Sequence, residues 1–199
     1  MAITRLGPNQ SVNLASNVTG TLPVANGGTA LTSGFKNGIT EHDEFRLTSS
    51  KTASNTISDI TANLARTTRS GFSLLGTGMT ESSGIFTFPS TGYYIVGVLN
   101  SYTTTDANRT NGVRLYVTTN NSTYYNVGAS SVNTSDDGGS SNSFGAIYSE
   151  YLIDVTDTSN VKVKFDVIAN NNAVTYNGDT SSTADGSSTR FMFTRIGDT

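Results

Sequence analysis

Short apolar runs bounded by turn residues are the feature that most constrains this chain. From residue 44 onward the runs are β-branched or aromatic, and Gly, Asn, Asp and Ser interrupt them every few residues. This spacing is typical of strands, and no segment keeps a sustained helical period, although 58–67 offers a weak helical candidate. The sequence therefore predicts an all-β sandwich or barrel. The expected strands are 44–50, 63–68, 84–89, 92–104, 112–120, 123–132, 144–155, 161–168 and 189–197.

Three of these runs are apolar on both faces. In 92–104 and 189–197, large apolar residues occupy odd and even positions alike, and "AIYSEYLIDV" within 144–155 also carries apolar groups on both faces. An antiparallel sandwich buries only one face of each sheet in its core, so the second face needs another cover. With no helix to supply it, a second copy of the same sheet is the simplest cover, which predicts a homo-oligomer. The expected interface residues are Tyr93, Tyr94, Ile95, Val96, Val98, Phe191, Met192 and Phe193, and alternation leaves open which face of each strand meets the neighbour.

Composition excludes several classes of function. Cysteine is absent and His42 is the only histidine, so disulfides, thiolate metal sites and histidine-dependent triads away from His42 are excluded. Charged residues are 14% of the chain, the net charge is −3 and no basic stripe occurs, so we expect no nucleic-acid partner. No apolar run is long enough to span a membrane, and the first ten residues lack the apolar core of a signal peptide. We expect a non-enzymatic protein without cofactor or metal, synthesised in a cytoplasm.

Two acidic stretches invite a metal-site interpretation. "EHDEF", Glu41–Phe45, places a histidine among three carboxylates, but neighbouring residues on a strand alternate between faces, so a solvated junction is the favoured interpretation. A trimer that gathered three His42 side chains on its axis would be the exception. "SDDGGSSN", Ser135–Asn142, lacks the regular ligand spacing of a calcium loop, and an ordinary turn is favoured there.

The run "GIFTFPSTGYYIVGVLNSYT" resembles the central motif of the C1q/TNF-like jelly roll. It has an aromatic–proline turn at Phe88 and Pro89, then Gly92, Tyr94 and a long apolar strand. The chain end "TRFMFTRIGDT" is similar to the final strand of that family. The resemblance covers 41–199 and implies a jelly-roll β-sandwich that forms tight threefold homotrimers by burying one sheet of each subunit around the axis. The polar insert 169–188 departs from the pattern, and we expect it to project as a loop.

The segment "SNVTGTLPVANGGTALTS" is similar to segments of bacteriophage fibre and virion-surface proteins. This resemblance implies an extended N-terminal attachment arm, residues 1–40, in front of a jelly-roll domain, residues 41–199. Its small residues would let chains approach a common axis, Pro23 favours an extended path, and Gly27 and Gly28 permit a tight turn. The residues expected to mediate virion attachment are Val18, Leu22, Pro23, Val24, Gly27, Gly28 and Leu31.

Two main functions fit these features. The first is a structural phage protein, a trimeric capsid decoration or head-fibre protein on the virion surface, bound to other virion proteins through its arm. The second is a short tail fibre whose domain binds a host surface glycan, because sugars pack on aromatic faces beside amides and carboxylates. The candidate glycan contacts are Tyr124, Tyr125, Tyr176 and Asp179, although strand packing is the favoured interpretation of these tyrosines. A secreted C1q-like lectin is a third class, which the N-terminus disfavours.

Overall fold

The described part of the chain consists of strands and turns. The computed structural model describes residues 39–68, 74–106, 108–135, 142–179 and 188–199. None of these residues forms a helix, so the described ranges contain no apolar helix that could cross a membrane. The strands are β1 (Glu41–Leu47), β2 (Lys51–Asp59), β3 (Leu64–Arg66), β4 (Thr80–Ser82), β5 (Ile85–Thr87), β6 (Gly92–Thr104), β7 (Asn108–Thr118), β8 (Tyr125–Thr134), β9 (Ser143–Val155), β10 (Lys162–Tyr176) and β11 (Arg190–Gly197).

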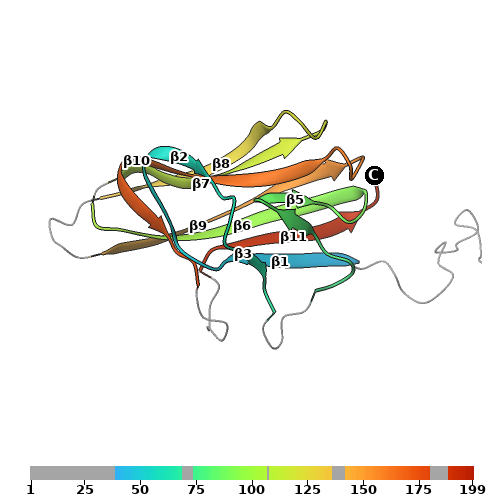
Figure 1. Ribbon diagram of the computed structural model, residues 1–199, viewed down its shortest axis with the longest axis horizontal. Coiled ribbons are helices and arrows are strands. Elements are labelled where there is room, and N and C mark those ends of the chain that lie inside the picture. The colour runs from blue at the N-terminus through green and yellow to red at the C-terminus, as the bar shows by residue number, and fades with distance from the viewer. Residues whose placement is uncertain (1–38, 69–73, 107, 136–141, 180–187) are drawn as a thin grey trace, which may run out of the picture. The chain divides into compact units, whose positions relative to one another are not determined.

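The strands form two antiparallel layers (Figure 1). The first layer has the order β3-β1-β11-β6-β9. The second is centred on β10, with β7 and β8 on one side, β2 and β5 sharing the other side, and β4 beyond β5. The layers are joined where the end of β10 pairs with β6, placing Tyr176 opposite Tyr102. The predicted all-β jelly-roll sandwich is confirmed, and it belongs to a unit that spans Ile39–Thr199.

A cluster of phenylalanines fills the space between the layers. Alternate residues of each strand point inward, and the rings of Phe86 and Phe193 lie 4.9 Å apart between centroids. Phe165 of β10 lies 4.6 Å from Phe191 of β11, so the cluster spans both layers. Phe45 of β1 meets Phe86 edge-on at 5.2 Å. Full burial of each ring contributes about 1.5–3 kcal/mol, and this cluster fixes which face of each strand is internal.

Strands β2 and β4 were not predicted. In β2 only Ala53 is buried, and the strand reads as a polar sequence without alternation. Backbone pairing holds β2 to β10, and because this pairing does not depend on the side chains, it produces no hydrophobic pattern in the sequence. The weak helical candidate 58–67 is wrong, because its first residues complete β2 and its last residues include β3.

The expected loop at 169–188 is wrong in its first part. Strand β10 continues through 169–176 and pairs with β2 on both sides of an irregularity between Ala169 and Ala173. Asn171 adopts a φ of 100°, a conformation that L-residues seldom take, so the strand bends there instead of ending. Residues 180–187 of the insert lie outside the described residues.

Candidate interaction face

The outward side of the first layer carries large apolar side chains exposed to solvent. On β9 the outward residues include Phe144, Tyr148 and Leu152, whose exposed fractions are 75%, 56% and 62%. Tyr93 on β6 and Ile196 on β11 are exposed beside them. We call this surface the interaction face; it comprises Tyr93, Ile95, Leu99, Phe144, Tyr148, Leu152, Met192 and Ile196. Contiguous exposed apolar surface of this kind marks a site of association in soluble proteins.

Strand register brings these side chains into one band. Ile95 lies opposite Leu152, and Leu99 lies opposite Tyr148, so β6 and β9 place apolar pairs side by side. Between these two pairs is Gly97, opposite Met192 on β11. A Cβ at Gly97 would lie 3.3 Å from both Met192 Cε and Tyr148 Oη, so these side chains close over the glycine. Because Gly97 has no side chain, Met192 and Tyr148 can lie over it and keep the apolar surface continuous across β6.

The structure divides the residues that the sequence placed at an interface. Tyr93, Ile95 and Met192 lie on the interaction face. The inward residues Tyr94, Val96, Val98, Phe191 and Phe193 are at most 1% exposed and pack in the core of the subunit. The prediction that these five contact a neighbouring copy is wrong, because they are buried in the core of the subunit, where Phe86 packs on Phe193 and Phe165 on Phe191. Sequence alternation could not separate the two sets, since both faces are apolar.

Five residues of the interaction face were not among the expected interface residues: Leu99 and Ile196, on strands that were expected there, and three residues of β9. Phe144, Tyr148 and Leu152 all belong to β9, a strand that carries apolar residues at odd positions too, such as Ile147 and Ile153. The signal that could have found them is the even-position series F-x-x-x-Y-x-x-x-L within the predicted strand. Its interruption by Ala146 and Glu150 hides the stripe from a simple alternation test.

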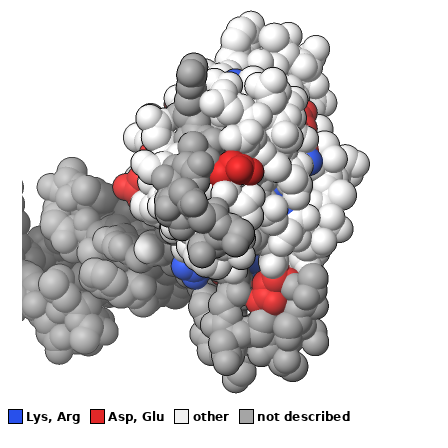
Figure 2. Space-filling view, turned by 90° about the vertical axis from the view of Figure 1, so that its left-hand side faces the viewer, with Lys and Arg blue, Asp and Glu red and all other residues white. Residues whose placement is uncertain are grey.

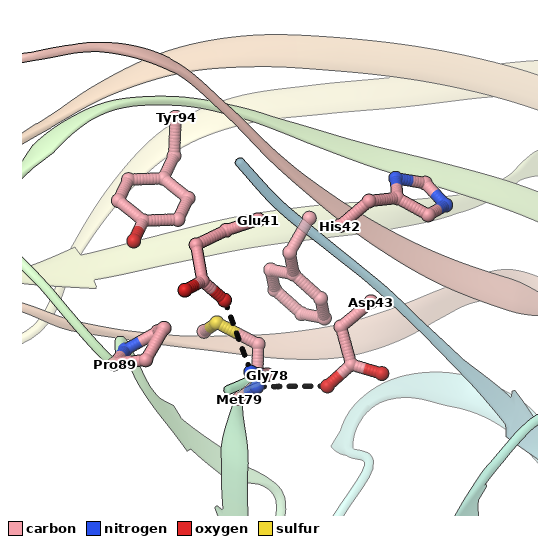
Figure 3. Close-up of a pocket in the computed structure, with 8 residues that line it drawn as sticks. Glu41, His42, Asp43, Gly78, Met79, Pro89 and Tyr94 are labelled. Atoms are coloured by element: carbon pink, nitrogen blue, oxygen red, sulfur yellow. Dashed lines mark hydrogen bonds between the residues drawn. The ribbon is translucent and has the colours of Figure 1, made fainter. Parts of the chain in front are cut away.

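Two of the three carboxylates of the "EHDEF" motif hold a loop. Figure 3 shows Glu41 and Asp43 pointing from β1 toward Gly78 and Met79. Glu41 Oε2 accepts the backbone N–H of Gly78 at 3.1 Å, and Asp43 Oδ2 accepts that of Met79 at 2.7 Å. The favoured interpretation of a solvated junction is corrected here, because Asp43 is buried and both carboxylates are used in folding.

Asp43 also forms a two-bond ion pair. The Arg66 guanidinium donates from Nε to Asp43 Oδ1 at 2.9 Å and from Nη2 to Oδ2 at 3.0 Å. The hydrogen bond to Asp43 raises the pKa of Arg66 above its usual value. A third bond runs from Arg66 to the Met79 carbonyl at 2.7 Å. The arrangement ties β1, β3 and the loop before β4 together.

His42 lies on the other side of β1 from these carboxylates. Its Nδ1 is 2.8 Å from Thr194 Oγ1 on the neighbouring strand β11. Within the described residues, no group of three or more His, Asp or Glu side chains is arranged to hold a metal ion. The space enclosed by Glu41, Met79, Pro89 and Tyr94 leaves no room for a water molecule (Figure 3). This region is therefore packed structure, and it offers no ligand cavity.

The four candidate glycan contacts do not come together. Tyr125 begins β8 and is 63% exposed, while Tyr124 is half-buried with its ring 5.3 Å from Lys164 Nζ. Tyr176 is fully buried, donates to the Ile168 carbonyl and accepts from Gly112 N at 3.2 Å. The prediction for Tyr176 is wrong, because the end of β10 is internal. Asp179 is half-buried and its backbone N–H donates to Leu47 O at 2.9 Å.

Two predicted sites lie outside the described residues. These are the attachment residues Val18, Leu22, Pro23, Val24, Gly27, Gly28 and Leu31, and residues 136–141 of the acidic turn.

Charged groups are sparse on the end of the jelly roll seen in Figure 2, where single red and blue groups interrupt an uncharged surface. No basic stripe is visible among the described residues in that view.

Comparisons with known proteins identify a shared fold. No protein-family model and no curated protein sequence match the chain. Among solved structures, Eiger TNF from S. frugiperda aligns with a TM-score of 0.59 and 11% identity, covering 81% of this chain and 96% of that one. Murine APRIL at pH 5.0 aligns with a TM-score of 0.49 and 14% identity, covering 77% of this chain and 98% of its own. The likeness to Eiger TNF shows that the chain has a TNF-like jelly-roll fold.

Proposed function

We propose that this chain is a non-enzymatic structural protein that assembles as a homotrimer through its interaction face and stands on the surface of a bacteriophage particle. The single observation that carries the assembly is the exposed apolar band formed by β6, β9 and β11. In an isolated subunit, Phe144, Tyr148 and Leu152 would remain in water. Covering them in an assembly is favourable by about 25 cal/mol for each Å² of apolar surface removed.

A copy of the same chain is the natural cover for this face. The band lies on a regular sheet surface, and two such surfaces pack closely through their side chains. The number of copies rests on the resemblance of "GIFTFPSTGYYIVGVLNSYT" to the C1q/TNF-like motif, which implies threefold assembly. The shared fold of the described residues supports that resemblance.

The virion role rests on a different part of the chain. The segment "SNVTGTLPVANGGTALTS" resembles phage fibre and virion-surface segments, which supports an attachment arm in 1–40. In this proposal the arm binds a capsid protein, and the jelly roll stands outward as a decoration or head-fibre knob. The protein is synthesised in the host cytoplasm and leaves the cell on the particle.

Adding purified protein to particles that lack it tests whether the arm carries the attachment. Full-length protein should restore normal occupancy, measured by electron microscopy and quantitative gels. A variant lacking residues 1–35 should fail to bind while sedimenting with the mass of three shortened chains. If the shortened variant decorates particles at normal occupancy, the jelly roll carries attachment and the assigned role of the arm is wrong.

A receptor-binding tail fibre is the second candidate. The observation that favours it is the exposed ring of Tyr125 beside Tyr124, because aromatic faces of this kind can pack on sugars. Replacement of Tyr125 by Ala leaves the core intact and should abolish adsorption to host cells under this candidate. Unchanged adsorption of otherwise normal particles would eliminate it.

A further inference from the structure

The charges around the interaction face are segregated by strand. Its central strand β6 presents Tyr93, Ile95, Gly97, Leu99, Ser101 and Thr103 outward, and none of these is charged. On one side of β6, the edge strand β9 presents two exposed carboxylates, Glu150 and Asp154. On the other side, Arg190 of β11 and Arg46 of β1 lie opposite one another in register. The acidic groups of β9 thus lie on one side of the uncharged strand β6, among the apolar residues of β9, and the basic groups of β11 and β1 lie on the other.

The acidic side has no ion-pair partner among the residues that the structure describes. Among the ion pairs of the described residues, none involves Glu150 or Asp154. Glu150 receives one hydrogen bond, from Tyr148 Oη at 2.9 Å, and this phenol brings no positive charge. Both exposed carboxylates therefore lie among apolar side chains without a cationic partner in the described part of the chain.

The basic side is only partly neutralised. Glu44, a buried residue of β1, lies 3.6 Å from Arg190 Nη1, a long separation for an ion pair. Glu44 also accepts a hydrogen bond from Thr67 Oγ1 at 3.0 Å. Arg46 donates to the backbone carbonyl of Asp179 at 2.6 Å, and this neutral acceptor does not offset the charge of the guanidinium.

We propose that neighbouring copies meet through unlike sides of the interaction face, with Glu150 and Asp154 of one subunit packed against Arg46 and Arg190 of the next. This inference rests on the proposed homotrimer and adds the orientation of its contacts. Packing β9 against β9 would bring four carboxylates together at an apolar contact, where like charges are strongly unfavourable. Unlike sides instead attract, and a head-to-tail contact of this kind closes into a ring when each subunit uses both sides.

Charge reversal tests the orientation. The variant Glu150→Arg with Asp154→Arg makes the acidic side basic, and Arg46→Glu makes part of the basic side acidic. Each should weaken association at least about tenfold, and combining them should recover most of the loss. Asp59→Arg is the matched control, because Asp59 pairs with Lys164 on the other layer and should leave association unchanged. Circular dichroism and urea unfolding establish that each variant is folded.

Salt dependence gives a second readout that needs no basic-side variant. Between about 0.05 and 0.5 M salt, attraction between unlike sides is screened, so association of the wild-type chain should weaken. The Glu150→Arg, Asp154→Arg variant should associate more strongly as salt rises, because repulsion is being screened. If the wild type is a trimer and neither reversal nor salt changes its association, this orientation is wrong while the homotrimer stands. A monomeric wild type overturns both.

Discussion

Shortening Leu152 to Ala should weaken assembly while leaving the subunit folded. Fully burying a leucine side chain is worth about 1.5–3 kcal/mol. Because 62% of Leu152 is exposed in the subunit, more than half of that energy remains to be gained in an assembly. We expect a loss of about 1 kcal/mol for each subunit, or about 3 kcal/mol for a trimer. Such a loss corresponds to roughly a hundredfold change in the association constant.

Sedimentation equilibrium at several protein concentrations measures this change. The matched control is Ile57→Ala, since Ile57 is a similarly exposed aliphatic residue, 49% exposed, on β2 of the other layer. The control should associate as the wild type does. Equal association constants for Leu152→Ala and the wild type would refute the assignment of β9 to the interface. Equal weakening in both variants would show a general loss of stability instead.

Two further predictions concern the subunit itself. Tyr176→Phe should lower the free energy of unfolding in urea by about 1–3 kcal/mol, because the Ile168 carbonyl and Gly112 N–H lose a buried partner. Burial raises the pKa of Tyr176 to about 12, so this residue should stabilise the wild type fully below about pH 10 and lose that contribution as the pH rises toward 12. The free energy of unfolding of the variant should fall less over this range, and an equal fall in both proteins would contradict this. Asp43→Asn should cost at least about 2 kcal/mol in urea unfolding, because Arg66 and Met79 N–H lose a charged acceptor, whereas an unchanged midpoint would contradict its anchoring role.

The long central strand could be predicted to the residue. Strand β6 begins at Gly92 and ends at Thr104, as expected from the turn "PSTG" before it and the unbroken apolar run after it. Gly92 has a φ of +135°, and a Cβ there would lie 2.4 Å from Gly197 O, so the turn requires glycine. Local sequence alone therefore specifies where this strand starts.

Positions set by distant contacts could not be predicted. Strand β2 is defined by backbone pairing with β10, more than a hundred residues later. Tyr176 is internal because the end of β10 pairs with β6, and its hydroxyl bonds to Gly112 and Ile168. For β6 and β11 the sequence shows apolar residues on both faces, yet it could not tell Tyr93, which lies on the outer face, from Tyr94, which lies in the core. That choice follows from the phenylalanine cluster, whose members come from four strands.

The mass of the full chain in solution tests the central claim most directly. The proposed homotrimer predicts that sedimentation equilibrium at micromolar concentration will give a mass three times that of the 20.9 kDa chain. The same mass should persist across a tenfold dilution, because separating the subunits would expose the apolar band to water. A single species with the mass of one chain, stable across that range, would contradict the claim that Phe144, Tyr148 and Leu152 are covered by further copies.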